Sequence, residues 1–182
     1  MSIESLKDAL PDYAKDLKLN LSNVLSTPGM TPSQIWGTAL ACAIASRSPI
    51  VLRAIAADAQ LDATQTAAAK TAAALMAMNN VYYRFTHLIE HQSPDYKTMP
   101  AKLRMNGLAS HGADPLDFEL WCLAVSAVNG CGRCLEAHEA VVLQKGASKE
   151  LVQNVVRIAA VVQAVGTVLE AAAILGDHPS CH

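Results

Sequence analysis

The sequence predicts an all-α fold. Alanine is abundant, runs of β-branched residues are short, and the prolines stand between the apolar segments rather than inside them. A chain of 182 residues can bury a substantial core, as one domain or as two small repeated units. We expect one helical domain over residues 1–176 and a flexible polar tail over residues 177–182.

The first half of the chain divides into four helical patterns. The opening pattern runs from Ser2 to about Leu19 and is interrupted at Pro11. A helix start is expected at Thr31-Pro32-Ser33, because the fixed φ of proline suits the first turn of a helix. The remaining patterns cover Ile35–Arg47, Pro49–Gln60 and Ala63–Glu90.

The second half is divided by breaks at residues 93–100 and 111–115, which are rich in proline and small polar residues. Asn129-Gly130 and Gly146 are further helix stops, and Ser148 is a cap. The helical patterns lie at Ala101–Leu108, at Leu116–Val128, from Cys131 to about Lys145, and from Ser148 to Leu175.

The composition limits the classes of partner. Hydrophobic residues make up 52% of the chain and charged residues 16%, so we expect part of the surface to be buried against other subunits. A net charge of −2 and an aromatic content of 4% provide neither a basic surface nor a stacking platform, which argues against nucleic-acid binding.

The sequence also indicates where the chain works. The N-terminus lacks the apolar core of a signal peptide. The apolar stretch from Ile158 to Leu175 contains Gln163, Gly166 and Glu170, so we expect a buried helix and no membrane span. Five cysteines, an odd number, fit a cytoplasmic redox pair better than a secreted disulfide framework.

One constellation carries chemistry: Cys131-x-x-Cys134 followed by His138, with Glu119 upstream. Positions i, i+3 and i+7 share one helical face, and Cβ atoms three residues apart lie about 5–6 Å from each other, which a modest adjustment brings into disulfide range. Both thiols start a helix directly after Asn129-Gly130. The helix dipole, together with Arg133, therefore predicts lowered thiol pKa values.

The other two residues suit proton transfer. His138 lies one turn beyond Cys134 and can take the thiol proton directly or through a water. A short connection would pair the helix of Glu119 with that of His138, so the carboxylate could orient the imidazole or pass protons.

The constellation stands in the second of two similar helix units. A shift of about 83–85 residues brings Trp36 near Trp121, and the order of helices and breaks then agrees. We expect an internal duplication, with a degenerate unit over about 31–90 and a catalytic unit over about 115–175.

Other roles for the cysteines and histidines fit the sequence less well. A zinc site needs four ligands, and no second pair is spaced for one; haem attachment needs histidine where Leu135 stands, and a thioredoxin motif needs a βαβ setting. We expect packing or surface roles for His87, His91 and His111, core positions for Cys42 and Cys122, and a loose tail for His178, Cys181 and His182.

The pattern Glu119-x11-Cys131-x-x-Cys134-x-x-x-His138 resembles that of the alkylhydroperoxidase D family, in the carboxymuconolactone decarboxylase-like superfamily. The resemblance covers essentially the whole chain. It is carried further by the opening Met1–Glu4, by Tyr13–Asp16, Met78–Arg84, Leu103–Asn106 and Phe118–Trp121.

The resemblance implies an all-helical homotrimer that reduces organic hydroperoxides to alcohols with thiols and holds no tightly bound cofactor or metal. Its electrons would come from a dihydrolipoyl group on a lipoylated acyltransferase component. It would also reduce a partner peroxiredoxin, alkyl hydroperoxide reductase C.

By the same resemblance, Cys134 would be the peroxidatic cysteine that becomes a sulfenic acid. Cys131 would be the proton donor and resolving thiol that closes the disulfide, and His138 and Glu119 would form the proton relay. Some members carry histidine where this chain has Arg133, and arginine cannot shuttle protons near neutral pH.

Three rival functions stay open at this point. The chain could be mainly a disulfide reductase that passes electrons from the lipoyl carrier to the peroxiredoxin. It could be a decarboxylase like the namesake of the superfamily, although that activity does not call for a Cys-x-x-Cys pair. It could also be a zinc-stabilised interaction protein, which would be recognised by bound metal.

Overall fold

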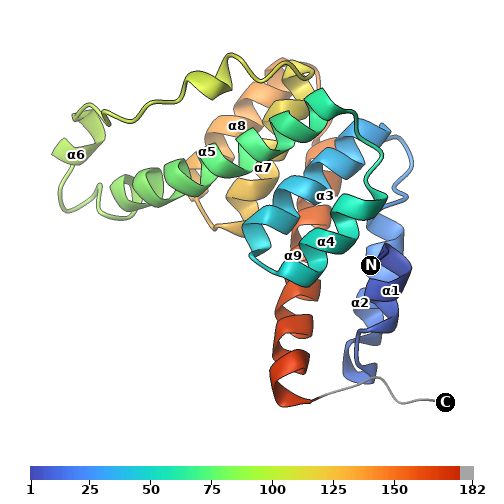
Figure 1. Cartoon of the computed structure of the whole chain (residues 1–182). Helices are drawn as coiled ribbons and strands as arrows, with labels where there is room; N and C mark the ends of the chain where they lie inside the picture. The colour runs from blue at the N-terminus through green and yellow to red at the C-terminus, as the bar shows by residue number, and fades with distance from the viewer. Residues whose placement is uncertain (177–182) are drawn as a thin grey trace.

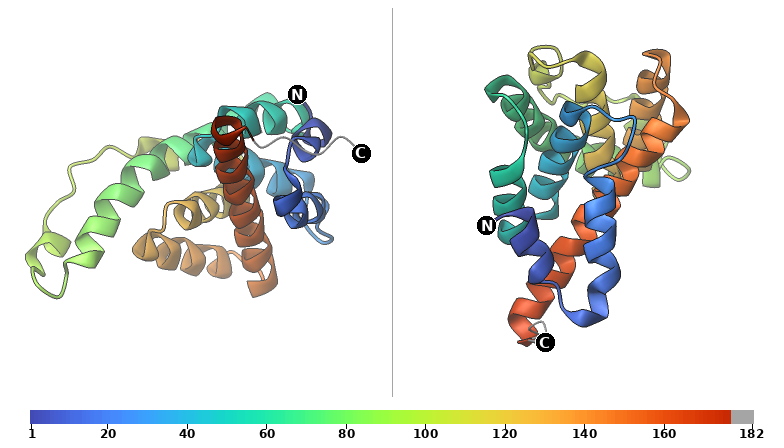
Figure 2. Two further views of the ribbon diagram at one scale, coloured as in Figure 1. Left: turned by 90° about the horizontal axis from the view of Figure 1, so that it is seen from below. Right: turned by 90° about the vertical axis from the view of Figure 1, so that its right-hand side faces the viewer.

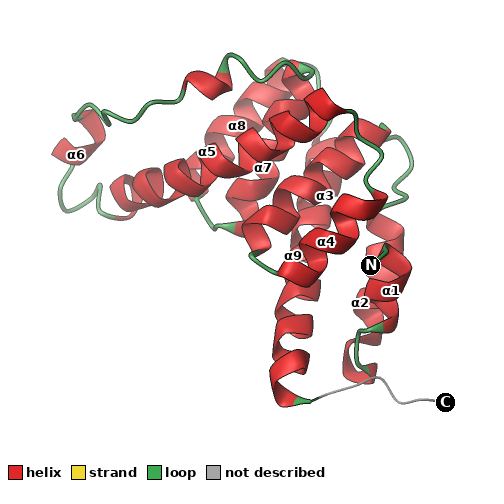
Figure 3. Ribbon diagram, in the orientation of Figure 1, coloured by secondary structure: helices red, strands yellow, loops and turns green. Residues whose placement is uncertain are grey.

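Two central helices organise the chain, α3 (Pro32–Ser46) and α7 (Pro115–Val128), which pack against each other. The computed structural model describes residues 1–176, in which every regular element is helical, as expected (Figures 1 and 3). The long helices α5 (Ala63–Leu88) and α9 (Lys149–Leu175) each pack on both α3 and α7. The remaining elements are α1 (Ile3–Asp8), η1 (Asp12–Ala14), α2 (Lys15–Val24), α4 (Pro49–Asp58), α6 (Asp95–Thr98), η2 (Asn106–Leu108) and α8 (Gly132–Gln144).

The core lies where α7 crosses its neighbours. Phe118 and Trp121 are its largest fully buried side chains. Gly37 of α3 faces the Trp121 indole so closely that a Cβ atom there would overlap the ring. The missing side chain thus sets the distance between the two central helices.

Helix starts follow the signals in the sequence. Thr31 begins α3 with a capping box, in which its side chain accepts from the backbone N–H of Gln34 and the Gln34 side chain accepts from that of Thr31. Asp62 forms the same motif at the start of α5. Prolines open α3, α4 and α7 at the first helical position, as predicted for α3 and α4, whereas the sequence assigned Pro115 to the break before α7.

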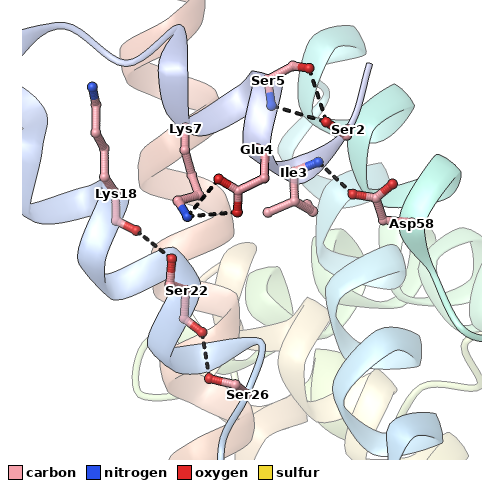
Figure 4. Close-up of polar contacts among 9 residues, drawn as sticks. All are labelled: Ser2, Ile3, Glu4, Ser5, Lys7, Lys18, Ser22, Ser26 and Asp58. Atoms are coloured by element: carbon pink, nitrogen blue, oxygen red, sulfur yellow. Dashed lines mark hydrogen bonds and ion pairs between the residues drawn. The ribbon is translucent and has the colours of Figure 1, made fainter.

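The N-terminal helices cover one side of the bundle, with α1 against α4 and α2 against α9. The backbone N–H of Ile3 donates to the Asp58 carboxylate at 2.7 Å and ties α1 to the end of α4 (Figure 4). The opening pattern breaks near Pro11 as expected, but α2 continues to Val24, beyond the predicted end at Leu19.

The prediction of a helix at Ala101–Leu108 is wrong. Only the short turn η2 forms there, and Lys102 takes a left-handed backbone conformation with φ of 52°, which a regular α-helix does not contain. A short helix, α6, forms instead within the region expected to be a break. The other helices begin and end within a few residues of the predicted bounds.

Helix α9 is long and apolar enough to cross a membrane by length and composition. Ile158, Val162, Val165 and Leu169 are buried, and the helix packs against α2, α3 and α7. One face of the predicted helix is therefore buried against the rest of the chain.

A projecting arm, residues 81–99, leaves the body of the molecule with the second half of α5 and with α6 (Figure 2). Large apolar side chains are exposed along it: Val81, Phe85, Leu88, Tyr96 and Met99.

The internal duplication stays a prediction. Ser48 and Cys131 hold the same N-cap position, at the start of α4 and of α8, as a duplicated unit would require. The predictions for residues 177–182, including Cys181, lie outside the described residues.

Candidate active site

The two thiols lie at the start of α8, where the sequence placed them. Gly130 turns the chain between α7 and α8 with a φ of 65°, a conformation that favours glycine. Cys131 then caps α8, and Cys134 stands in its first turn. Both cysteines are free thiols in this structure.

Burial overturns the expectation of a lowered thiol pKa at Cys134. Its side chain is only 6% exposed. Loss of solvation raises the pKa of the Cys134 thiol to about 12, and the adjacent Cys131 adds to the rise, although Asn80 and Arg133 lower it. Loss of water therefore outweighs the charge of Arg133, so the resting Cys134 is a protonated thiol at neutral pH.

His138 and Glu119 meet as the sequence predicts. The antiparallel packing of α7 and α8 places Glu119 Oε2 2.7 Å from His138 Nδ1. An ionised carboxylate at this distance accepts from Nδ1–H and so fixes the imidazole tautomer with Nε2 free to act as a base. Nε2 lies 3.3 Å from the Met76 sulfur on α5.

Helix α5 supplies an asparagine that sequence reasoning missed. The Asn80 amide donates to Ser126 Oγ at 3.0 Å and accepts from the Asn129 side chain at 2.9 Å. Arg84 in turn donates to the Asn129 carbonyl oxygen at 2.7 Å. This network ties α5 to the turn before Cys131, and Asn80 also hydrogen-bonds Cys134.

A pocket of about 260 Å³ opens onto Cys134 and His138. Most of its other walls are apolar and come from α5, α8 and the segment before α7, with Met76, Tyr83, Met105, Leu108 and Ala137 among them. Asn79 adds one polar side chain to the lining. Such a pocket suits a small molecule with an apolar body and a polar reactive end.

Arg133 separates this pocket from a more polar hollow. Its guanidinium lies 5.9 Å from the centre of the Tyr83 ring, within range of a cation–π contact. The hollow, of about 530 Å³, is lined by Arg133 together with His87, Glu90, Lys97 and Glu136. Arginine at this position provides fixed charge and no proton transfer.

The remaining cysteines and histidines have the places expected for them. Cys42 and Cys122 are fully buried in the core, where burial raises the pKa of both thiols. His111 stacks on Phe118 with ring centres 3.8 Å apart. Within residues 1–176, no group of three or more histidine, cysteine or acidic side chains is placed to hold a metal ion.

Comparison with known proteins agrees with this arrangement. Residues 94–177 match the model of the carboxymuconolactone decarboxylase family. A protein of Gluconacetobacter diazotrophicus named alkyl hydroperoxide reductase AhpD is 56% identical, over 99% of each chain. The chain belongs to the alkylhydroperoxidase D family.

Further relatives carry the same name. One from Rhodospirillum centenum is 57% identical over 96% of this chain and 94% of its own, and one from Streptomyces griseus is 52% identical over 97% of this chain and 100% of its own. The family named from the motif is therefore confirmed, while the roles of the individual residues stay predictions.

Proposed function

We propose that this chain is a thiol peroxidase that reduces alkyl hydroperoxides to alcohols through a dithiol–disulfide cycle of Cys131 and Cys134. The observation that carries the proposal is the His138–Glu119 pair, with 2.7 Å between its atoms, in the same apolar pocket as a buried cysteine. The names of the relatives support the choice of peroxide as substrate.

The first step consumes the peroxide. Because burial keeps the Cys134 thiol protonated, His138 must accept its proton as the sulfur attacks, directly or through a water. The sulfur bonds to the terminal peroxide oxygen and the O–O bond breaks. Cys131 gives its proton to the departing alkoxide, which leaves as the alcohol, and Cys134 becomes a sulfenic acid.

The second step closes the disulfide. The Cys131 thiolate attacks the Cys134 sulfur, and the sulfenic oxygen leaves as water after it takes up a proton. His138, protonated in the first step and held by Glu119, is positioned to return that proton. A dithiol donor then reopens the disulfide by exchange.

The proposed donor is a dihydrolipoyl group on a lipoylated acyltransferase component, which needs no cofactor bound to this chain. The same cycle would regenerate the peroxiredoxin alkyl hydroperoxide reductase C in the cytoplasm. We further propose a homotrimer, a state supported by the apolar side chains exposed on the projecting arm.

A peroxidase assay with lipoylated carrier tests the proposal. We expect Cys134→Ser to abolish turnover, because no sulfur remains to attack the peroxide. Cys131→Ser should consume about one equivalent of peroxide and then stop, since no disulfide can form. Continued turnover by the Cys134→Ser protein would contradict the assigned roles.

A second candidate is an enzyme that mainly reduces the peroxiredoxin disulfide. The raised pKa of Cys134 slows attack on a hydroperoxide and on a disulfide alike, because the thiolate is the nucleophile in both reactions. Turnover of hydroperoxide and reduction of the oxidised peroxiredoxin, compared at the same concentration of dihydrolipoamide, separate the two candidates.

A further inference from the structure

Asn79 is a buried polar side chain in the active-site pocket that the proposed mechanism does not use. It is only 4% exposed, and it lines the pocket together with Cys134 and His138. Its Oδ1 atom is buried without a hydrogen-bond partner among the described residues. A buried amide that lacks a partner destabilises the fold, so its presence calls for an explanation.

The neighbouring asparagine shows that this helix can satisfy a buried amide. Asn80 donates to Ser126 and accepts from Asn129, so both sides of its amide are used within the protein. Asn80 is thus part of the scaffold, whereas Asn79 lines the pocket and its buried Oδ1 atom has no hydrogen-bond partner among the described residues.

We propose that the Asn79 amide binds the peroxide group of the substrate and presents its terminal oxygen to Cys134. This inference rests on the proposed function and assigns the group that recognises the hydroperoxide. The apolar walls from Met76, Met105 and Leu108 would hold the alkyl part of the same molecule.

The chemistry of the two groups is complementary. A carboxamide offers an acceptor oxygen beside a donor N–H, and an alkyl hydroperoxide offers a donor O–H beside an acceptor oxygen. The two can form a pair of hydrogen bonds in one orientation. That pair of hydrogen bonds fixes the direction of the O–O bond relative to the Cys134 sulfur. Attack of the sulfur on the terminal oxygen depends on this orientation. Rotation of the Asn79 amide by 180° exchanges its oxygen and nitrogen. The side chain can therefore pair with the hydroperoxide in either of two orientations.

The test compares Asn79→Leu with Asn80→Leu. Leucine has the branched shape of asparagine, with bulkier methyl groups, but forms no hydrogen bond, so Asn79→Leu should lose about tenfold or more in kcat/KM for hydroperoxide, the loss expected for one or two hydrogen bonds. The same variant should unfold at an unchanged or higher temperature, since it removes an amide that lacks a partner. Asn80→Leu should instead lower the unfolding temperature, because it leaves Ser126 and Asn129 unpaired.

A half-reaction identifies the occupant. The oxidised disulfide form, mixed with dihydrolipoamide, contains no peroxide, so Asn79→Leu should be reduced at the same rate as the parent. A slower reduction with unchanged peroxide kinetics would overturn the inference and assign the amide to the lipoyl donor.

Two further results separate a failure of the Asn79 role from a failure of the proposed peroxidase function. A parent with normal peroxide turnover and an Asn79→Leu variant with the same kcat/KM would overturn the role of Asn79 alone. A parent that turns over no hydroperoxide would overturn both.

Discussion

At the scale of single residues, the site depends on the charge of Glu119. Among the described residues, its carboxylate is the one side-chain hydrogen-bond partner of His138 Nδ1, at 2.7 Å. Glutamine has almost the same shape but no charge, so it cannot stabilise the imidazolium that forms when His138 takes a proton.

We expect Glu119→Gln to lower kcat/KM for hydroperoxide by about 100-fold, the lower end of what a positioned acid–base group contributes. The measurement is steady-state turnover with dihydrolipoamide over a range of pH. Glu150→Gln, which removes the same charge from an exposed position at the start of α9, is the control and should retain full activity. Equal losses in both variants would rule out the relay.

The raised pKa of Cys134 makes a second prediction at this scale. A thiol is reactive as its thiolate, so a pKa raised by burial means that reactivity keeps increasing with pH beyond the ordinary thiol pKa of about 8.5. We expect the alkylation rate of Cys134 in a Cys131→Ser protein to rise throughout pH 7 to 10, approximate limits that bracket this ordinary value.

The unfolded protein is the control for that experiment, because its thiols titrate near their ordinary value. Alkylation of the folded protein should lag behind it at every pH below the folded pKa. A rate that levels off below the ordinary thiol pKa would show that the helix dipole and Arg133 outweigh burial after all.

The residue-level expectations show what a sequence can reveal. The spacing of Cys131, Cys134 and His138 was enough to place them on one helix, because helical geometry is local. The pKa of Cys134 was predicted in the wrong direction, because it depends on how many atoms of other helices cover the sulfur. Asn79 and Asn80 lie within Met78–Arg84, a segment that carries the resemblance, but the sequence does not reveal their roles, since these arise from contacts with the distant pocket and the α7–α8 turn.

At the scale of helices, the site is held by the contact between α3 and α7. Glu119 lies on α7, two residues before Trp121, and the Trp121 indole packs directly over Gly37. A methyl group at position 37 would overlap that ring, and neither helix can move without disturbing the buried core around it.

We therefore expect Gly37→Ala to lower the free energy of unfolding by about 1–3 kcal/mol, the usual cost of overpacking a core. Urea unfolding followed by circular dichroism measures it. In the control Gly166→Ala, the added Cβ atom would meet Ser48 Cβ at 3.1 Å, a tight contact that a small shift relieves. The higher helix propensity of alanine offsets much of that cost, so the control should change stability far less. If Gly166→Ala is as destabilised as Gly37→Ala, the loss of stability does not come from overlap with the Trp121 ring.

Local signals predicted most of the helices but not the segment that closes the pocket. Caps and prolines fixed the starts of α3, α4 and α7, because both act within one turn. The helix expected at Ala101–Leu108 did not form, and this segment instead brings Met105 and Leu108 to the pocket. Packing against α5 decides its path, and such a contact between distant segments leaves no periodic pattern in the sequence.

At the scale of the whole molecule, large apolar side chains are exposed as a group on the projecting arm, and Ile174 and Leu175 are exposed at the end of α9. Leu88 is 71% exposed on the arm, and Val81 is 61% exposed on the same helix. The composition predicted that some surface would be buried between subunits, and the structure shows where a large apolar surface is available. Figures 1 and 2 show this arm at the opposite end of the molecule from α1 and α2.

We expect Leu88→Asp to convert the proposed trimer into monomers, because a carboxylate buried in an apolar interface would lose its solvation without a partner. Light scattering coupled to gel filtration measures the mass of the assembly. The matched control is Leu19→Asp on α2, since Leu19 is also largely exposed, at 66%, but lies away from the arm. If both variants keep the mass of the parent trimer, the arm is not the interface; if the parent itself is a monomer, the proposed trimer is wrong. A monomeric Leu88→Asp protein with an unchanged unfolding temperature would show that the arm serves assembly and is not needed for the fold of the single chain.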